Sequence, residues 1–212
     1  MTQPTVLVLA TRNKGKTAEI RSLLSRFPVT IRDLDDFGPI PAVAEDGLTF
    51  EENAYKKASV TARVLGHTAI ADDSGLLVEA LEGAPGVHSA RYAGPSASDA
   101  DRCEKLLAEL KGSPNRRAAF ECVISIAVPS GAALTYEGRC NGLIAEAPAG
   151  ENGFGYDPVF HYPPAGKTFA QMTLEEKGRV SHRGIALAEL AGEFDKVLIW
   201  IGQQMRRSEA AT

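Results

Sequence analysis

The sequence predicts an α/β protein with a mixed central sheet flanked by helices. Strand-like and helix-like segments alternate along the first part of the chain, which favours helices layered against a sheet. Two long strand candidates, 118–128 and 132–147, follow one another across Pro129-Ser130-Gly131, which is a hairpin signal. Strands linked by helices pair in parallel and strands linked by hairpins pair antiparallel, so both kinds of pairing are expected in one sheet.

The first elements are expected to be a strand, a helix and a second strand. Val6–Ala10 is a short apolar run, as in a strand buried on both faces. Residues 14–26 carry apolar residues at helical spacing, and Pro28 ends that helix. Residues 29–34 alternate weakly and predict a second strand. Residues 35–49 are rich in Asp, Gly and Pro, so they predict a long loop, which in a compact domain is often functional.

The middle of the chain adds a helix, a buried strand and a further loop. Thr49, with a glutamate three residues on, resembles a capping box for a helix that extends to Leu65. Residues 68–71 predict a strand that ends in the polar run 72–75. Residues 83–98 are dense in Gly and Pro and are expected to be mostly loop.

The C-terminal part is expected to contain two helices around the hairpin. Residues 99–111 predict a helix with Leu106, Leu107 and Leu110 facing inward, and residues 148–168 predict a Gly/Pro-rich loop. Ser181 is expected to cap a final helix that runs to about Met205, with an inward face made of Ile185, Ala188, Ala191, Phe194, Leu198, Ile201 and Met205. No internal repeat or linker divides the chain, so a single domain over residues 1–212 is expected.

Composition and charge limit the classes of function. The net charge of −4 argues against a general binder of nucleic acid or of anionic membranes, but it allows a small anionic ligand in a locally basic pocket. Three cysteines without CxxC spacing indicate a reduced, intracellular protein. No signal peptide and no apolar stretch of roughly 18 residues is visible, so a cytoplasmic location without membrane contact is expected.

The stretch VLVLATRNKGKTAEI raises the question of phosphate binding. A P-loop has the pattern G-x-x-x-x-G-K-[ST], and the position of its first glycine is occupied here by Ala10, inside the strand-like run. Two interpretations remain open. One is a polar turn with a helix cap. The other is a different phosphate site, in which Thr11 and Asn13 offer polar groups, Lys16 offers a cation and the helix N-terminus offers free N–H groups.

Two acidic stretches provide candidate metal ligands. Asp72 and Asp73 follow an apolar strand, and adjacent strand residues point to opposite faces, so one should face a site while the other supports it. Hard cations such as Mg²⁺ take carboxylate oxygens, whereas the structural alternative is an Asx-type turn. Glu45 lies in the earlier acidic loop, and Asn53 and Lys57 share a face of the helix that follows; a charged surface helix is the alternative there.

Two C-terminal motifs provide candidate groups for a nucleoside. Phe154 and Tyr156 in NGFGYDPVF can stack on a base or fold into the core. Lys177, His182 and Arg183 lie at or just before a predicted helix start, where the helix dipole disfavours cations. A local rule broken in this way is typical of functional sites, although basic residues that snorkel at the surface would look the same.

Together and in this order, the motifs TRNKGK, GLTFEENAYKKA, ADDSGL, GAPGVHSARYAG, GFGYDPVF and EEKGRVSHRGIAL resemble the inosine triphosphate pyrophosphatase family. The resemblance runs from about residue 6 to 190 and implies an elongated, two-lobed α/β domain with a nucleotide cleft between the lobes, and a homodimer. It also implies Mg²⁺-dependent hydrolysis of ITP, dITP and XTP to the nucleoside monophosphate and pyrophosphate, which clears these deaminated purine nucleotides from the pool.

The resemblance also implies roles for individual residues. Asp73 corresponds to the catalytic carboxylate and metal ligand. Glu45 is the second metal carboxylate, although AEDG stands where relatives often have EETG. The implied substrate-binding residues are Thr11, Asn13, Lys16 and Lys57 for the triphosphate, Ser74 beside it, and Phe154, Gly155, Tyr156, Asp157, Lys177, His182 and Arg183 for the nucleoside and base.

The implied chemistry is physically coherent. Hydrolysis at the α-phosphorus needs positioned phosphates, charge neutralisation and an oriented water. The ordinary pKa of an aspartate is low, so orientation and metal binding are expected to explain more of the role of Asp73 than proton abstraction. Arg183 only donates hydrogen bonds, so it suits the C6 oxygen of hypoxanthine and meets adenine's amino group unfavourably, which is worth about 10- to 100-fold. Guanine has the same oxygen, so this contact does not explain rejection of GTP.

Two rival functions remain open from the sequence. A phosphohydrolase or kinase that cleaves the γ-phosphate would release orthophosphate or ADP instead of pyrophosphate. A nucleotide sensor with the same pocket would bind ITP with Mg²⁺ and release no product.

Overall fold

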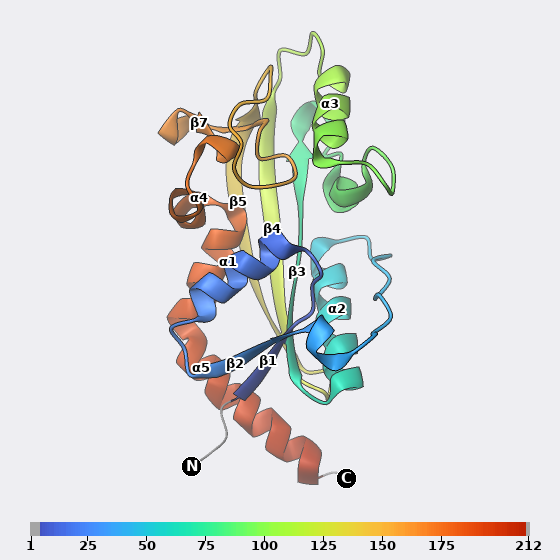
Figure 1. The fold of residues 1–212 in the computed structure, drawn as a ribbon, viewed down its shortest axis with the longest axis vertical. Coiled ribbons are helices and arrows are strands. Elements are labelled where there is room, and N and C mark those ends of the chain that lie inside the picture. The colour runs from blue at the N-terminus through green and yellow to red at the C-terminus, as the bar shows by residue number, and fades with distance from the viewer. Residues whose placement is uncertain (1–4, 211–212) are drawn as a thin grey trace. The chain divides into compact units, whose positions relative to one another are not determined.

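In the computed structural model, which describes residues 5–210, a sheet runs in the order β2-β1-β3-β4-β5-β6-β7 (Figure 1). β1 pairs in parallel with both β2 and β3, whereas β6 pairs antiparallel with β5 and with β7. The predicted mixed sheet is therefore confirmed. The strands are β1 Thr5–Leu9, β2 Val29–Asp33, β3 Thr68–Val78, β4 Arg117–Ala127, β5 Ala133–Ile144, β6 Phe160–Tyr162 and β7 Lys167–Thr168.

Helices alternate with the first strands and close the chain. Within the described residues, the α-helices are α1 Lys14–Leu24, α2 Phe50–Leu65, α3 Asp99–Glu109, α4 Leu174–Val180 and α5 His182–Ala210. Short 3₁₀ helices lie at Leu34–Phe37, Glu79–Leu81, Gly86–Arg91, Pro163–Ala165 and Phe169–Gln171. The loop expected over 35–49 therefore begins with a 3₁₀ turn and is irregular from Gly38 to Thr49.

The chain divides into two compact units. Unit 1 comprises the described residues up to Asp73, together with Val123–Glu137 and the chain from Ala186 onward. Unit 2 comprises Ser74–Cys122 and Gly138–Ile185. The boundaries fall inside β3, β4, β5 and the first turn of α5, so the chain passes from one unit to the other within regular elements.

In unit 1, α2 covers one face of β1 and β3, and α1 and α5 lie on the other side (Figure 1). Val8 of β1 belongs to a cluster with Ala58 and Ala62 of α2, where small side chains let the helix lie close to the sheet. Leu7 and Leu9 alternate with Val8 and are also buried. The prediction that this strand is buried on both faces is confirmed.

Polar side chains begin the first two helices, as the sequence indicates. Asn13 Oδ1 accepts a hydrogen bond from Lys16 N at 3.1 Å, and Thr49 Oγ1 accepts one from Glu52 N, also at 3.1 Å. The carboxylate of Glu52 accepts from Leu48 N at 2.7 Å, so the capping box expected at Thr49 forms only its first half.

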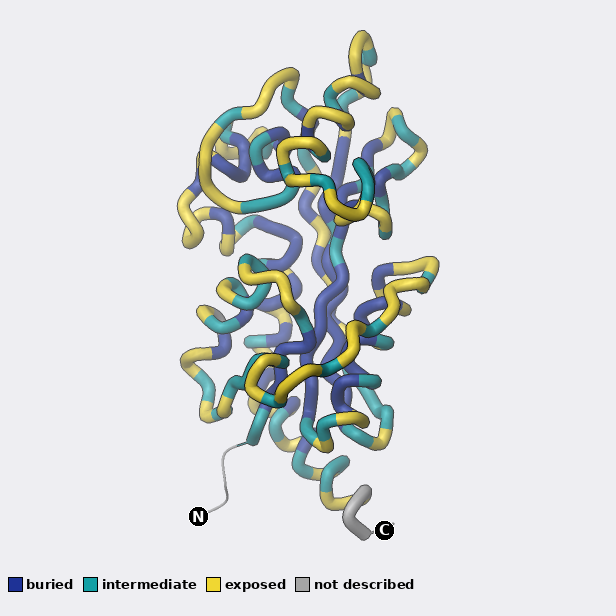
Figure 2. The backbone as a smooth tube through the Cα atoms, turned by 45° about the vertical axis from the view of Figure 1, so that its right-hand side comes forward, coloured by how far each residue is buried: buried dark blue, intermediate teal, exposed yellow. Residues whose placement is uncertain are grey.

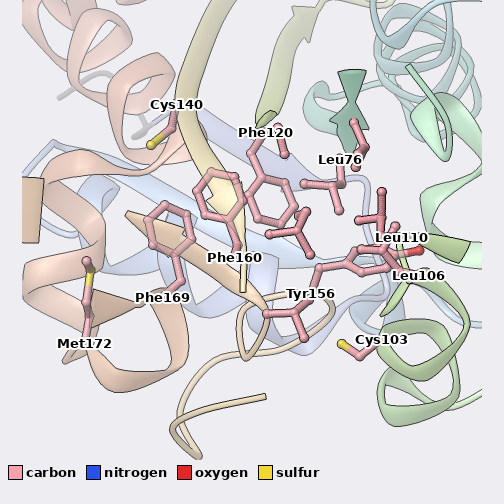
Figure 3. Close-up of a cluster of buried hydrophobic side chains, with 14 residues drawn as sticks. Leu76, Cys103, Leu106, Leu110, Phe120, Cys140, Tyr156, Phe160, Phe169 and Met172 are labelled. Carbon is pink, nitrogen blue, oxygen red and sulfur yellow. The ribbon is translucent and has the colours of Figure 1, made fainter. Parts of the chain in front are cut away.

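The core of unit 2 is a cluster of aromatic and aliphatic side chains from several elements (Figure 3). Leu106 of α3 and Leu110, the C-cap residue of that helix, are fully buried in this cluster, as predicted, and Leu107 is partly buried beside it. The ring of Phe160 lies 4.6 Å from that of Phe120, centroid to centroid, in the tilted arrangement that aromatic pairs prefer.

Burial follows the central strands. Figure 2 shows these strands dark blue over most of their length, with exposed residues gathered on loops and outer helix faces. Cys103, Cys122 and Cys140 are buried, and no disulfide joins any of these three residues. None of the described helices combines the length and apolar character that a membrane span requires.

Two of the element boundaries predicted from the sequence are wrong. The strand expected to end at Ala71 continues as β3 through both aspartates to Val78. Charged residues can occupy a buried strand interior when each has a partner, and both aspartates have a lysine partner. The region 148–168 was expected to be loop, but it contains the short strands β6 and β7.

The C-terminal helices also differ from the prediction. Lys177 lies in the last turn of α4, where a cation favours the helix dipole, so its placement breaks no local rule. The inward face of α5 is rotated from the expected one, because Ile185 and Ala188 are exposed. The buried residues of this helix beyond its first turn are Ala186, Leu187, Leu190, Phe194, Val197 and Ile201.

Candidate active site

The turn between β1 and α1 is organised by its own polar side chains. Thr11 Oγ1 accepts from Asn13 N at 3.2 Å, and Asn13 in turn caps α1. Asn13 is exposed and Thr11 is partly exposed, so both polar groups lie at the surface beside the first turn of the helix. The strand–turn–helix arrangement predicted from the sequence is present, and it directs helix N–H groups to the side where an anion is favoured.

Lys16 projects from the first turn of α1 to the first of the two strand aspartates. Its Nζ lies 3.0 Å from Asp72 Oδ2, and the Asp72 side chain is fully buried. The ion pair holds the lysine's ammonium at the sheet while part of its side chain remains accessible. Asp72 therefore has the supporting role that alternation along the strand suggested for one of the pair.

Lys57 of α2 joins the second aspartate to the acidic loop. Its Nζ donates to Asp73 Oδ1 at 2.7 Å and to Glu45 Oε1 at 3.2 Å. Asp73 and Lys57 are both buried, whereas Glu45 is exposed to solvent. The two neighbouring aspartates thus pair with lysines from two different helices, Asp72 with Lys16 and Asp73 with Lys57.

These charges shift the pKa values of both partners. Burial alone lowers the pKa of Lys57, but the carboxylates of Asp73, Asp72 and Glu45 outweigh it and raise the pKa above its ordinary value. Burial raises the pKa of Asp73, and Lys57 and Lys16 offset this only in part. The two directions are compatible because Lys57 faces three carboxylates, whereas for Asp73 the lost hydration and the nearby Glu45 together outweigh the two lysines.

The carboxylates of Glu45 and Asp73 suit a hard divalent cation. Both reach the same lysine nitrogen, so their oxygens lie near one another and currently share one positive charge. Residues 5–210 contain no group of three or more His, Cys, Asp or Glu side chains arranged for a metal. One or two carboxylates, completed by water and phosphate oxygens, is the usual environment of Mg²⁺.

The loop GFGYDP of unit 2 is closed by one buried carboxylate. Asp157 Oδ2 accepts from Phe154 N at 2.9 Å and from Lys177 Nζ at 2.6 Å. A Cβ at Gly153 would lie 2.0 Å from that same oxygen, and its φ is +78°, so this position requires glycine. Lys177 Nζ also lies 4.7 Å above the ring of Phe154. Loop, helix α4 and aromatic ring are thereby fixed together.

The two aromatic residues of that loop have different surroundings. Tyr156 is 3% exposed within the core cluster, and its hydroxyl donates to Ser89 O at 3.0 Å. The interpretation of an aromatic folded into the core therefore applies to Tyr156, and its ring is not placed to stack on a ligand base. Phe154 is partly exposed, and Gly155 N donates to Asp99 Oδ2 at 2.6 Å.

The start of α5 buries two of the predicted basic residues. Arg183 is 1% exposed, and its Nη2 donates to Ser74 Oγ at 2.8 Å. His182 is buried and stacks on Phe120, with centroids 4.6 Å apart and planes 12° apart. Ser181 Oγ accepts from Gly184 N at 3.0 Å, which confirms the predicted cap. Because His182 and Arg183 are buried, the alternative of basic side chains that snorkel at the surface is wrong for both.

The predicted residues therefore form one set in each unit. Lys57 of unit 1 contacts Asp73 and Glu45, and the turn at Thr11 begins the helix that carries Lys16. The set of unit 2 consists of Ser74, Phe154, Gly155, Asp157, Lys177, His182 and Arg183, with Tyr156 beneath them in the core.

Sequence reasoning missed Ser89 as a supporting residue. Its hydroxyl accepts from Leu76 N at 2.9 Å and donates to Gly86 O at 2.7 Å, and its carbonyl receives the Tyr156 hydroxyl. It lies in the motif GAPGVHSARYAG, which is one of the motifs that carry the family resemblance. The motif was the available signal, but the backbone partners of Ser89 could be recognised only in the structure.

Comparison with known proteins places the chain in a family. The model of the Ham1 family matches residues 7–193, and the chain belongs to the Ham1 family. A protein of Syntrophobacter fumaroxidans named dITP/XTP pyrophosphatase is 69% identical over 196 residues, which cover 92% of this chain and 84% of that protein. A protein of Geobacter sulfurreducens with the same name is 53% identical over 188 residues, or 88% of this chain and 94% of that protein.

Solved structures agree with the fold. A HAM1 protein from Coxiella burnetii is 41% identical, has a TM-score of 0.85, and the match covers 91% of this chain and 99% of that one. A nucleoside-triphosphatase, or dITP/XTP pyrophosphatase, from Mycobacterium abscessus is 42% identical with a TM-score of 0.72, and the match covers 88% and 97% of the two chains. The predicted family and the predicted α/β fold with a mixed sheet flanked by helices are therefore confirmed.

Proposed function

We propose that this protein hydrolyses the deaminated purine nucleoside triphosphates dITP, ITP and XTP to the nucleoside monophosphate and pyrophosphate. The reaction clears these nucleotides from the nucleotide pool. Relatives that match nearly the whole chain are named for this activity. The observation that carries the proposal is Lys57, whose ammonium holds the carboxylates of Asp73 and Glu45 together beside a second lysine–aspartate pair.

The residues of unit 1 bind the triphosphate. Lys16 and Lys57 supply positive charge, and Thr11 and Asn13 supply a hydroxyl and an amide at the N-terminus of α1. Both lysines are already paired with carboxylates, so their ammonium groups are held in place before the phosphates arrive. Preorganised charge of this kind stabilises a transferring phosphoryl group without reorganisation during the reaction.

Asp73 orients the water that attacks the α-phosphorus. The bond from that phosphorus to the bridging oxygen breaks, pyrophosphate leaves, and the proton of the water passes to the Asp73 carboxylate and then to solvent. We expect orientation of the water and metal binding to contribute more to the role of Asp73 than this proton transfer, because Lys57 and Lys16 offset part of the rise that burial gives to its pKa. Asp73 and Glu45 would hold Mg²⁺, which neutralises phosphate charge when it is bound.

The residues of unit 2 bind the nucleoside. Phe154 offers a partly exposed ring for the base, and the Asp157–Lys177 pair holds this ring in place. Arg183 and His182 supply donors for the base. The remaining proposed substrate-binding residues are Ser74, which bonds to Arg183, and Gly155 and Tyr156, which contribute through the backbone of their loop.

Arg183 favours bases with an oxygen at C6. Its guanidinium donates and cannot accept, so it pairs with the oxygen of hypoxanthine or xanthine and leaves the amino group of adenine without a partner. Burial of Arg183 strengthens this choice, because an unsatisfied group in a buried site cannot turn to water. The contact does not separate hypoxanthine from guanine.

We further propose that the chain acts in the cytoplasm as one catalytic domain spanning residues 1–212, and as a homodimer. Cysteines outside disulfides are typical of a reducing compartment. The net charge of −4 disfavours nucleic acid as a partner.

The variant Asp73→Asn tests the proposal. Loss of the carboxylate is expected to lower pyrophosphate release from dITP by at least about 100-fold, because it removes both the proton acceptor and a metal ligand. The circular dichroism spectrum should stay unchanged, and Asp195→Asn, at an exposed position on α5, should keep full activity. Near-normal turnover by Asp73→Asn would refute the role. Orthophosphate release by the wild type would indicate cleavage of the γ-phosphate, and binding without product would indicate a sensor.

A further inference from the structure

The acidic loop of unit 1 is bonded to α2 by four successive residues in reversed order. Glu45 pairs with Lys57, Asp46 with Lys56, Gly47 with Asn53 and Leu48 with Glu52. The loop therefore runs antiparallel along one side of the helix. This segment, residues 45–48, is called the acidic strap below.

Burial does not hold the acidic strap. Leu48 is 86% exposed, and Glu45 and Asp46 are exposed as well. The Lys56–Asp46 pair is solvent-exposed on both sides, and such pairs contribute little. The position of the strap must therefore depend on the bonds that are shielded from water.

Asn53 makes two of the three part-buried bonds of the strap, and the third joins Glu45 to Lys57. Its side chain is 1% exposed, its Oδ1 accepts from Gly47 N at 2.9 Å, and its Nδ2 donates to Gly47 O at 3.4 Å. An amide is the side-chain group that offers one acceptor and one donor side by side, so it satisfies both backbone groups of a single residue. Asn53 thus bonds to both backbone groups of Gly47, as the backbone of a neighbouring strand would.

The contact is close enough to require glycine at position 47. A Cβ on Gly47 would lie 2.8 Å from Asn53 Oδ1 and 2.9 Å from Glu52 Cβ. Real Cβ contacts are not that short, so any side chain would push the strap away from α2. The contact between Asn53 and Gly47 is called the clamp below. Its two halves, Asn53 in the helix and Gly47 in the loop, can be removed by separate substitutions.

We infer that Asn53 is a positioning residue for the reaction, which fixes the acidic strap so that the Glu45 carboxylate faces Lys57 and Asp73. Gly47 is two residues from Glu45, and Lys57 is one helical turn from Asn53 on the same face of α2. Clamping the backbone at Gly47 therefore limits where the Glu45 carboxylate can reach. The inference rests on the proposed function only in assigning a divalent cation to Glu45 and Asp73.

Two variants test the inference, Asn53→Ala and Gly47→Ala, with Thr49→Ala and Lys56→Gln as controls. Thr49→Ala removes a cap bond at the same helix end, and Lys56→Gln removes the exposed ion pair of the same strap. Gly47→Ala leaves the interior of α2 untouched, so it tests the clamp even if Asn53→Ala weakens the fold. Glu45→Gln provides the reference for losing the carboxylate itself.

The first readout needs no substrate. Mn²⁺ alone, added to each purified variant and followed by electron paramagnetic resonance, should bind about 10-fold or more weakly in Asn53→Ala, Gly47→Ala and Glu45→Gln than in the wild type and both controls. Hydrogen exchange at the amides of Gly47 and Leu48 should accelerate in Asn53→Ala and not in Lys56→Gln. Mn²⁺ affinities within about 2-fold of the wild type for both clamp variants would overturn the inference.

The second readout is pyrophosphate release from dITP as Mg²⁺ is varied. The Mg²⁺ concentration for half-maximal rate should rise by about 10-fold or more in the clamp variants, with a smaller change in KM for dITP at saturating Mg²⁺. An equal rise in Thr49→Ala would reduce Asn53 to a general structural role and overturn the inference. If the wild type releases no pyrophosphate, the proposed function fails, and the Mn²⁺ and exchange measurements still decide the role of Asn53.

Discussion

The ion pair between Lys177 and Asp157 gives a sharp test of how the nucleoside-binding residues are held. Replacing Lys177 by Met removes the ammonium and keeps an unbranched stem. Replacing Asp157 by Asn removes the charge and keeps an oxygen that can accept from Phe154 N and Lys177 Nζ, because a single carboxylate oxygen accepts both bonds now. The two single variants and their combination form a double-mutant cycle.

The magnitude follows from burial and distance. The side chains of Lys177 and Asp157 are 5% and 3% exposed, and their charged atoms lie 2.6 Å apart. At an effective dielectric constant of about 20, unit charges at that distance attract by roughly 6 kcal/mol before the loss of hydration is subtracted. Removing only one partner leaves a buried charge, so Lys177→Met is expected to lower the free energy of unfolding by about 3–5 kcal/mol. Asp157→Asn keeps its hydrogen bonds and should cost less.

Urea unfolding followed by circular dichroism measures these costs. The double variant should lose about 2 kcal/mol less than the sum of the two single variants, because the pair is coupled. Arg179→Met is the matched control, since Arg179 lies two residues from Lys177 in α4 and pairs with Glu175 in full exposure. It should change stability by less than about 0.5 kcal/mol. The reasoning would be refuted by a Lys177→Met cost no larger than that of Arg179→Met, or by additive costs.

Three further outcomes are expected. Arg183→Ala should narrow the ratio of kcat/KM for dITP over dATP by about 10-fold or more, and an unchanged ratio would rule out its proposed part in base choice. Burial raises the pKa of Cys103 and Cys140 to about 11. A thiol reagent at pH 8 should therefore label the native protein slowly and the urea-unfolded protein quickly. Rapid labelling of the native protein would show that these thiols are accessible. Arg116→Ala removes the donors to three backbone carbonyls and should lower the free energy of unfolding, measured in urea, by about 2 kcal/mol. An unchanged free energy of unfolding would mean that water replaces the lost hydrogen bonds.

The elements that the sequence predicted well are those with local causes. The apolar run of β1, the caps Asn13 and Thr49, and the turn at Pro129 each depend on neighbouring residues, so the chain itself displays them. The inward leucines of α3 follow from helical spacing alone. These features needed no knowledge of distant contacts.

The errors arose where partners distant in sequence decide the outcome. Asp72 and Asp73 look like the end of a strand, but Lys16 and Lys57 from two helices allow β3 to continue through them. β6 and β7 are too short to show any periodicity. In α5, apolar residues lie on more than one stripe, and exposed Ile199 shows that hydrophobic spacing alone could not select the buried face.

In the candidate site, too, local features could be predicted from the sequence and contacts between distant residues could not. The sequence supplied the chemical types of the residues, but the pairing of Lys57 with both Asp73 and Glu45 required the structure. The sequence allowed the ring of Tyr156 either to stack on a base or to fold into the core, and only the structure shows that it lies in the core. The clamp by Asn53 was visible in the sequence only as a residue that shares a helix face with Lys57.

Product analysis with a panel of nucleotides tests whether the protein hydrolyses dITP and XTP to pyrophosphate. The purified wild-type protein is incubated with Mg²⁺ and, separately, with dITP, XTP, dATP and dGTP, and pyrophosphate and orthophosphate are quantified together with the nucleotide product. We predict equal amounts of pyrophosphate and nucleoside monophosphate, with dITP and XTP at least about 10-fold preferred over dATP. Orthophosphate as the main product, or no product despite nucleotide binding, would contradict this prediction.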